Sequence, residues 1–228
     1  MTVDFRKNVA KVWSKVSKFD RATIFGDDNA KWMPDKNRDH AKQAAAGWVG
    51  ANYRPGGLVI IAANPGGGGD AYSATDNDKK LYDTFHSLRS AQSEDDWVAA
   101  FEKMSIEYMR QTTGHNISLP ISKILESAAR DDDQCAFLNS IPFRTKGNSW
   151  PGVQVIQRAA EKALIPQLHA LSPGIIVLLG KKACEVYDRH LKHISAEMFC
   201  IPRQIGDRGI PPKALVELER LRTYCKQA

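Results

Sequence analysis

The chain has 228 residues, of which 43% are hydrophobic, and this length and composition are sufficient for one substantial core. We therefore expect a single domain over residues 1–228, with insertions, rather than two domains. The sequence has no run of about 18 apolar residues, and its charged N-terminus lacks the apolar core of a signal peptide. These features predict a soluble, cytoplasmic protein without a membrane-spanning segment.

The net charge is +6 and the isoelectric point is about 9.1, but the charge is unevenly distributed. Residues 70–133 carry 13 acidic and 7 basic side chains, which leaves 25 basic and 13 acidic side chains for the two ends. If the fold brings these ends together on one face, that face suits a phosphate backbone. The alternative is an ordinary solvated surface, because no run of basic residues is longer than a few positions.

The N-terminal segment, residues 1–56, is predicted to be a helical extension. Apolar residues at helical spacing with lysines and an arginine between them predict a basic amphipathic helix over residues 3–18. A second helix is predicted over residues 39–49, after an irregular polar stretch. A turn at residues 53–57 then precedes the first strand.

The stretch from Gly57 to Tyr72 is the feature around which the rest of the chain is organised. Its aliphatic run, residues 58–61, predicts a buried strand that ends at Asn64 and Pro65, followed by four glycines, residues 66–69. In open α/β sheets, ligands bind beyond the carboxyl ends of the strands, where glycines let backbone amides approach a substrate. A tight turn without a ligand is the alternative.

The rest of the chain alternates between helices and short strands. Helices predicted over residues 78–88, 95–109 and 121–130 make residues 73–133 a helical connection. Further strands are predicted at residues 135–138, 175–179 and 198–201, with helices at residues 153–171 and 181–191, and a closing helix from Pro211 with the core stripe Leu215, Leu218 and Leu221.

This alternation predicts an α/β protein, a three-layer α/β/α fold with a central, mostly parallel sheet of about four strands. Right-handed crossovers would bring the loops after Ile61, Leu138 and Ile201 to one edge of the sheet.

The cysteines are Cys135, Cys184, Cys200 and Cys225, and no two of them form a C-x-x-C pair. Their spacing does not indicate a zinc ribbon or the four thiolate ligands of an iron–sulfur cluster. We therefore expect four reduced, mostly buried thiols, no metal and no organic cofactor.

Three motifs, in this order, resemble segments of the uracil-DNA glycosylase superfamily, and within it the mismatch-specific uracil and thymine-DNA glycosylases. Residues 62–66, AANPG, are similar to that group's G-I-N-P-G loop, and Tyr72 falls within one residue of an aromatic downstream of it. Residues 138–145, LNSIPFRT, resemble its T-N-x-x-x-R-T segment, and residues 173–183 resemble the superfamily's strand-Gly-helix segment.

The resemblance implies a uracil-DNA glycosylase-like domain and a monofunctional DNA glycosylase. Such an enzyme flips a pyrimidine out of the DNA and hydrolyses its N-glycosidic bond, which needs a positioned water and stabilisation of the leaving base. Asn64 would orient the water through its amide oxygen. Asp70, the nearby carboxylate, is the alternative base, although a turn residue and a helix cap are the structural alternatives for these two positions.

The remaining site residues divide into two groups. For the flipped base, Asn139 offers one donor and one acceptor to the Watson–Crick edge, and Gly66, Gly67 and Tyr72 belong to the same substrate site. For the DNA backbone and the vacated stack, the expected residues are Arg144, Lys146, Arg203 and Arg208. The expected partner is DNA, bound by a monomer.

The chain departs from the superfamily at Ala62 and at Pro202-Arg203-Gln204, where other members have variants of H-P-S or M-P-S. In the fast uracil enzymes, a histidine in this loop stabilises the departing base anion. Because this chain lacks that histidine, we expect a slow enzyme. One rival function is a nucleic-acid-binding protein of the same fold that has lost catalysis. Another is a small-molecule nucleotide enzyme, but the glycine loop lacks the phosphate-binding motifs G-x-x-x-x-G-K-[ST] and G-x-G-x-x-G.

The choice of base is suggested by the glycines. In the fast uracil enzymes, a tyrosine at the position of Gly66 excludes substituents at C5 of the pyrimidine, and here that barrier is absent. The glycines at residues 67–69 would leave the same side of the base pocket without side chains, although each glycine costs conformational entropy on folding. We therefore expect a pocket for a bulky C5 group, either thymine or a hypermodified cytosine of phage DNA in an antiviral defence. Repair of uracil or thymine mismatches is the alternative.

Overall fold

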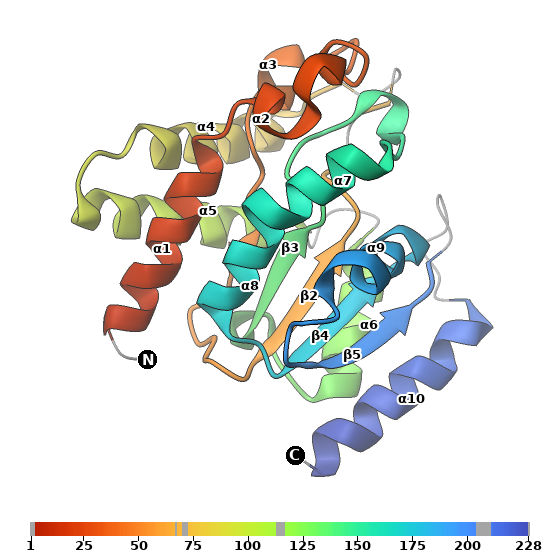
Figure 1. Cartoon of the computed structure of the whole chain (residues 1–228). Coiled ribbons are helices and arrows are strands. Elements are labelled where there is room, and N and C mark those ends of the chain that lie inside the picture. The colour runs from red at the N-terminus through yellow and green to blue at the C-terminus, as the bar shows by residue number, and fades with distance from the viewer. Residues whose placement is uncertain (1–2, 67, 70–72, 113–116, 204–210, 228) are drawn as a thin grey trace.

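The computed structural model describes residues 3–66, 68–69, 73–112, 117–203 and 211–227, arranged around one five-stranded sheet (Figure 1). The strands are β1 (Trp48–Val49), β2 (Leu58–Ala62), β3 (Cys135–Asn139), β4 (Ile175–Leu179) and β5 (Glu197–Ile201). Their order is β1-β3-β2-β4-β5, and only β1 runs antiparallel to its neighbour among the described strands. The predicted α/β class and the mostly parallel sheet are confirmed.

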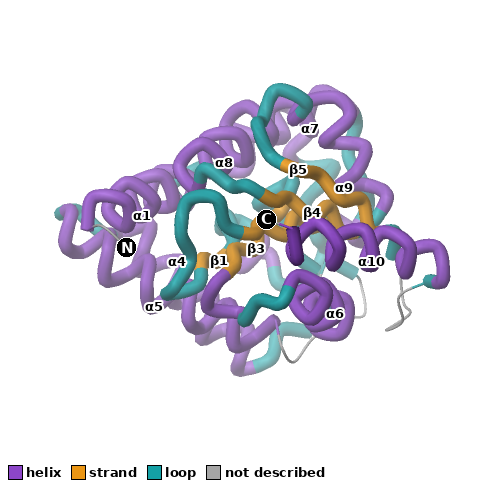
Figure 2. Tube along the Cα trace, turned by 90° about the horizontal axis from the view of Figure 1, so that it is seen from below, coloured by secondary structure: helices purple, strands orange, loops and turns teal. Residues whose placement is uncertain are grey.

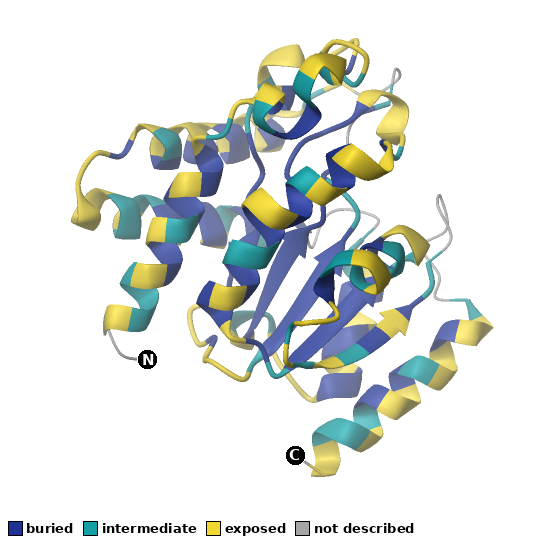
Figure 3. Cartoon of the chain, viewed as in Figure 1, coloured by how far each residue is buried: buried dark blue, intermediate teal, exposed yellow. Residues whose placement is uncertain are grey.

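The three inner strands are buried along their whole length, which explains why β2 and β4 are aliphatic throughout and why the first four residues of β3 are apolar. All five residues of β2, of β3 and of β4 are buried, because helices cover both faces of the sheet (Figure 3). The edge strand β5 instead alternates between exposed and buried positions. Since β2 to β5 are parallel, the loops that follow them leave the same edge of the sheet, as predicted.

The helices form a layer on each side of the sheet and a group at its β1 end (Figure 2). Helices α7, α8 and α9 lie on one face, α6 and α10 on the other, and α1, α4 and α5 pack together beside β1. Their bounds are α1 Val3–Ser17, α2 Arg21–Phe25, α3 Arg38–Ala41, α4 Asp76–Ser90, α5 Glu94–Thr112, α6 Ser118–Ala128, α7 Val153–Ala159, α8 Ile165–Leu171, α9 Lys181–Val186 and α10 Pro212–Gln227.

Short 3-10 and π turns complete the helical structure. The 3-10 turns are Gly26–Asn29, Asp132–Gln134 and Lys146–Asn148. The π turn Ala160–Leu164 joins α7 to α8, so the predicted helix over residues 153–171 is continuous in space. The π turn Tyr187–Leu191 extends α9 in the same way. None of the described helices is both long enough and apolar enough to cross a membrane.

The helix predicted over residues 39–49 is wrong. Its last two residues form a fifth strand, β1, which the sequence analysis did not predict. The helix α3 ends at Ala41, and Trp48 and Val49 instead pair with Phe137 and Ala136 of β3. Gly47 has φ +85°, and a Cβ there would lie 2.1 Å from the carbonyl oxygen of Phe137. Close approach to β3 therefore overrides the local helix preference of the alanines before Gly47.

The predicted core stripe of the closing helix is partly wrong. Leu218 and Leu221 are buried in α10, but Leu215 is 58% exposed. The helix contacts β5 and α6, and it buries only a narrow stripe because it covers the edge of the sheet rather than its centre (Figure 2).

The expectation of four reduced thiols is also corrected. Cys184 in α9 and Cys200 in β5 form a disulfide with a Cα–Cα distance of 5.8 Å, whereas Cys135 and Cys225 are free. The two bonded residues are 16 positions apart, and the packing of α9 against β4 and β5 brings them together. This proximity is a tertiary effect that the spacing alone did not indicate.

We expect alkylation of the unreduced, denatured protein to label two cysteines, because the other two are bonded to each other. Reduction, or the substitution Cys184→Ser, should lower the free energy of unfolding by about 2–4 kcal/mol, since it frees a short loop in the unfolded chain. Mass spectrometry and chemical denaturation measure both effects. Cys225→Ser is the control and should leave the stability nearly unchanged; four labelled cysteines would contradict the bond.

Candidate active site

The loops after β2 and β3 are bonded to each other at the carboxyl edge of the sheet. The backbone N–H of Ser140 donates to the carbonyl of Ala62 at 2.8 Å, and that of Ile141 donates to the carbonyl of Ala63 at 3.0 Å. The ladder between the two strands therefore continues past their ends. It fixes the segment before Asn64 against the second loop, residues 140–150.

Asn64 is held by a buried threonine of that second loop. Its Nδ2 lies 3.1 Å from Thr145 Oγ1 and 3.4 Å from the carbonyl oxygen of Pro65, and Thr145 is fully buried. The Thr145 hydroxyl in turn donates to the carbonyl of Ser149 at 2.7 Å. Because this bond uses the only hydroxyl proton, Thr145 must accept from Asn64.

This proton arrangement determines the orientation of the Asn64 amide. The amino group has to face Thr145, so the carbonyl oxygen Oδ1 faces the other way. Asn64 is only partly buried, and an amide oxygen in this position is a suitable acceptor for a hydrogen bond from water. The sequence predicts Asn64 as a site residue, and the structure adds Thr145 as the residue that orients it.

The glycine loop packs against the second loop by its backbone. The Gly68 N–H donates to Asn148 Oδ1 at 2.9 Å, and the Gly147 N–H donates to the carbonyl of Gly68 at 2.7 Å. A Cβ on Gly68 would lie 1.9 Å from the carbonyl oxygen of Thr145, so no side chain fits there. Gly68 is therefore required by close packing, which corrects the expectation that it clears a pocket wall.

Gly66 differs from Gly68, because a Cβ placed on it would meet no atom of the described residues within 4 Å. Among the described residues, the space beside Gly66 is therefore open. This agrees with the expected absence of a side chain that would exclude a substituent at C5 of the pyrimidine. The other glycine of the expected substrate site, Gly67, lies outside the described residues, as do Asp70, Tyr72 and Arg208.

Asn139 lies at the end of β3 and is 3% exposed. Its Nδ2 donates to the hydroxyl of Tyr108 at 3.1 Å and to the carbonyl of Ala45 at 3.4 Å. The pKa of Tyr108 is raised by burial, so its hydroxyl stays protonated. Because the amino group is bonded inside the protein, the structure argues against an Asn139 that reads a base with both its donor and its acceptor.

Arg144 is also buried, which corrects the expectation that it holds a DNA phosphate. It is 6% exposed, its Nη2 lies 3.1 Å from Asp78 Oδ1, and its guanidinium lies 4.9 Å from the Tyr82 ring centroid. Asp78 also accepts hydrogen bonds from the N–H and the hydroxyl of Thr75, which form the cap of α4. Arg144 therefore ties the second loop to the start of α4.

Lys146 and Arg203 remain at the surface of the carboxyl edge. The Lys146 ammonium lies 2.9 Å from Asp35 Oδ1, and its side chain is 50% exposed, so this ion pair is weak and open to competition. Arg203 is partly buried, and burial lowers its pKa. Its Cβ lies 3.8 Å from the position of a Cβ on Gly180, at the end of β4.

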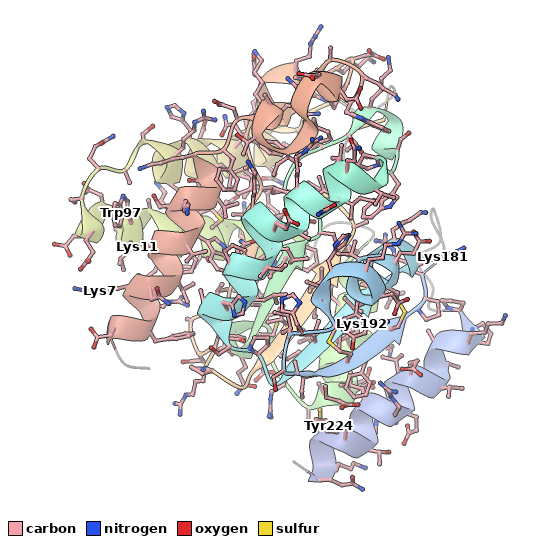
Figure 4. All side chains as sticks on the ribbon, viewed as in Figure 1. Lys7, Lys11, Trp97, Lys181, Lys192 and Tyr224 are labelled. Carbon is pink, nitrogen blue, oxygen red and sulfur yellow. A yellow bond between two sulfur atoms is a disulfide. The ribbon has the colours of Figure 1, made fainter. Side chains whose placement is uncertain are left out.

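Lysines from the two basic ends of the chain lie at different sides of the described part of the molecule. Figure 4 shows Lys7 and Lys11 on α1 at one side of the molecule and Lys181, the first residue of α9, at the other. Lys7 is also paired with Glu94, at 2.6 Å. The labelled lysines therefore give no single basic face, contrary to the arrangement that the charge distribution left open.

Arg21, which follows the first helix, is a site neighbour that the sequence analysis missed. It is 3% exposed, and its Nη1 donates to the carbonyl of Arg144, the residue before Thr145, at 2.7 Å. A single arginine in an irregular polar segment carries no signal that it will be buried. Only the fold brings it under a loop 123 positions away.

No group of three or more His, Cys, Asp or Glu side chains that could hold a metal ion occurs in the described part of the chain. The geometry instead offers an oriented amide, an open space beside Gly66 and a buried cation under the second loop. A scan against protein-family models and a search of curated proteins found no match to this chain.

Proposed function

We propose that the protein is a monofunctional DNA glycosylase of the uracil-DNA glycosylase superfamily, which excises a modified or mismatched pyrimidine and leaves an abasic site. The observation that carries this proposal is the oriented amide of Asn64. Its amino group is committed to Thr145, whose own proton is committed to Ser149, so its oxygen is left to hold a water. The loop motifs described above support the same reaction.

The reaction that we propose needs no redox step and no covalent intermediate. The bond between C1′ of the sugar and the base nitrogen breaks, and its electron pair leaves with the base. The water held by Asn64 adds its oxygen to the oxocarbenium-like sugar and loses a proton to solvent. We propose that the protein acts as a monomer on DNA in the cytoplasm.

For the substrate, we propose a pyrimidine with a bulky group at C5, such as thymine or a hypermodified cytosine of phage DNA. The open space beside Gly66 supports this choice, whereas Gly68 no longer does, because its lack of a side chain is explained by packing. Excision of modified phage bases would serve antiviral defence. Excision of uracil or thymine from mismatches would serve base-excision repair.

The test is an alkali-cleavage assay on end-labelled DNA that contains uracil, a G·T mismatch or glucosylated hydroxymethylcytosine. We expect abasic sites in at least one C5-substituted substrate, formed faster than at uracil. Preference for unsubstituted uracil over all the others would contradict the substrate proposal but not the reaction.

A second candidate is a nucleic-acid-binding protein of this fold without catalysis. It is favoured by one specific observation, the engagement of the Asn139 amino group by Tyr108 and Ala45, which removes a donor for base recognition. The same assay distinguishes the two candidates. DNA binding without abasic sites on any base tested would favour the binder.

Gly66→Tyr should change which base is accepted, because a ring there would fill the open space beside the loop. We expect the rate on C5-substituted substrates to fall by on the order of a hundredfold, with the rate on uracil changed by less than about threefold. Gly152→Tyr is a matched control, since a Cβ at that position also meets nothing within 4 Å but belongs to the start of α7. Equal effects of Gly66→Tyr on all substrates would contradict the role of Gly66 in selectivity.

A further inference from the structure

Arg21 is a buried cation whose hydrogen-bond partners are all neutral. Its Nη1 donates to the carbonyls of Ala41 at 2.9 Å and Arg144 at 2.7 Å, and its Nη2 donates to the carbonyl of Trp32 at 2.9 Å. Its Nε donates to Asn29 Oδ1 at 3.1 Å. Among the described residues, no carboxylate forms an ion pair with this guanidinium, although only 3% of the residue is exposed.

Burying a charged side chain only to donate hydrogen bonds to neutral carbonyls is unfavourable in free energy. Burying an unpaired charge costs far more free energy than burying a neutral donor. Elsewhere in this chain neutral side chains make such links: the Trp13 indole donates to the carbonyl of Gly47, and the Gln167 amide donates to that of Ala46. Linking the N-terminal extension to the rest of the fold therefore does not explain why position 21 carries a charge.

The charge is retained at neutral pH and is not cancelled by its surroundings. Burial lowers the pKa of Arg21 to about 10, which still leaves it protonated at pH 7. Its neighbour Arg144 is paired with Asp78, so that pair adds little net charge. The Phe25 and Phe143 rings, with centroids 4.4 and 5.5 Å from the guanidinium, keep water away from it.

The charge is also bonded to the loop that holds the candidate site. Arg21 holds the carbonyl of Arg144, and the next residue, Thr145, holds Asn64. In a poorly hydrated environment a charge acts over a longer distance than it does in water. The departing pyrimidine is an anion, because it takes the electron pair of the broken bond to C1′.

We propose that Arg21 supplies the positive charge that stabilises this departing base. The inference rests on the proposed glycosylase function and names the electrostatic partner of its leaving group. Arg21 keeps its own proton and does not touch the base; solvent protonates the base after it leaves. Arg21 would in this way compensate for the histidine that the last loop lacks.

The experiment compares uracil with 5-fluorouracil in DNA, because the fluorinated base is the better leaving group and needs less stabilisation. In single-turnover assays, we expect Arg21→Gln to slow release of uracil by at least on the order of tenfold, but release of 5-fluorouracil by less than about threefold. Arg21→Lys, which keeps a charge but loses most of the hydrogen bonds, should preserve the ratio of the two rates.

Two other arginines serve as comparisons. Arg158 donates from Nε to the carbonyl of Ile24 at 2.8 Å, so Arg158→Gln breaks a similar link to the extension without touching the second loop. We expect it to leave the ratio of the two rates unchanged. Arg203 is the rival source of positive charge. If Arg203→Gln slowed release of uracil more than release of 5-fluorouracil, and Arg21→Gln did not, the proposal would be overturned.

The outcomes separate this inference from the function on which it rests. If the unaltered protein releases no base from any substrate of the alkali-cleavage assay, the function fails; if it releases uracil and Arg21→Gln slows release of uracil and 5-fluorouracil equally, only the inference fails. If Arg21→Gln does not fold, the unaltered protein is used instead, with uracil bound beside abasic-site DNA. We expect ultraviolet titration to give a lower pKa at N1 of uracil in this complex than in free uracil, and an unchanged pKa would overturn the proposal.

Discussion

Replacing Asn64 with alanine is expected to slow base release by on the order of a hundredfold or more, while DNA affinity changes by less than a few-fold. The substitution removes the amide that orients water, but it removes no phosphate contact. Single-turnover kinetics and a binding titration on the same substrate measure the two effects separately. A variant that keeps the parental rate would show that Asn64 is only a turn residue.

Two substitutions of Thr145 form a matched pair that tests whether this residue orients the Asn64 amide. Thr145→Val keeps the shape of the side chain but removes the oxygen that accepts from Asn64 Nδ2 and donates to the carbonyl of Ser149. We expect it to slow base release because the Asn64 amide loses its fixed orientation, whereas Thr145→Ser, which keeps the hydroxyl, should retain most of the rate. Equal rates in the two variants would contradict the orienting role.

Replacing Arg144 with methionine is expected to lower the free energy of unfolding by about 3–5 kcal/mol, because it leaves the carboxylate of Asp78 buried without its cation. The side chains of Arg144 and Asp78 are 7% and 3% exposed, so water cannot replace the lost partner. The double substitution Arg144→Met with Asp78→Asn should recover part of this loss. Chemical denaturation of the single and double variants measures the coupling.

The surface pair of Lys146 with Asp35 is the control for Arg144. Lys146→Ala should cost less than about 1 kcal/mol, because both side chains are at least half exposed. If Arg144→Met left stability unchanged but reduced the salt dependence of DNA binding, Arg144 would be a phosphate ligand after all.

The sequence was sufficient for the parts of the fold that are determined locally. The residues of β2 and β4 and the first four residues of β3 are apolar without a break because both faces of these strands are buried, and a Pro or Gly follows each strand within three residues. Helical periodicity gave α1, α4, α5 and α6 to within a few residues. The predicted meeting of the first two loops follows from parallel strands alone.

The parts that were missed depend on contacts between distant residues. The strand β1 forms because residues 48–49 meet β3, against the helix preference of the alanines before them. Arg21 and Arg144 look like surface charges in the sequence, but both are buried, and each is bonded to a residue more than 60 positions away. No local pattern distinguishes a buried arginine from an exposed one.

The glycine loop shows the same limit at the site itself. The sequence assigned one role to the run of glycines, but the structure separates Gly68, which is fixed against Thr145, from Gly66, which faces open space. The reason lies in the second loop, where the Thr145 carbonyl oxygen leaves no room for a Cβ on Gly68 and the Asn148 side chain, 80 positions away, accepts from its N–H. Sequence alone therefore located the candidate site but could not assign a role to each of its glycines.

The most direct test of the proposed function is a mass balance on the unaltered protein and on Asn64→Ala. Each is incubated in excess with DNA that carries a C5-substituted pyrimidine, and mass spectrometry quantifies the free base and the abasic sugar. We predict one free base for each abasic site, no strand break before alkali treatment, and almost no product with Asn64→Ala. DNA that is bound by the unaltered protein but keeps all of its bases would contradict the proposal.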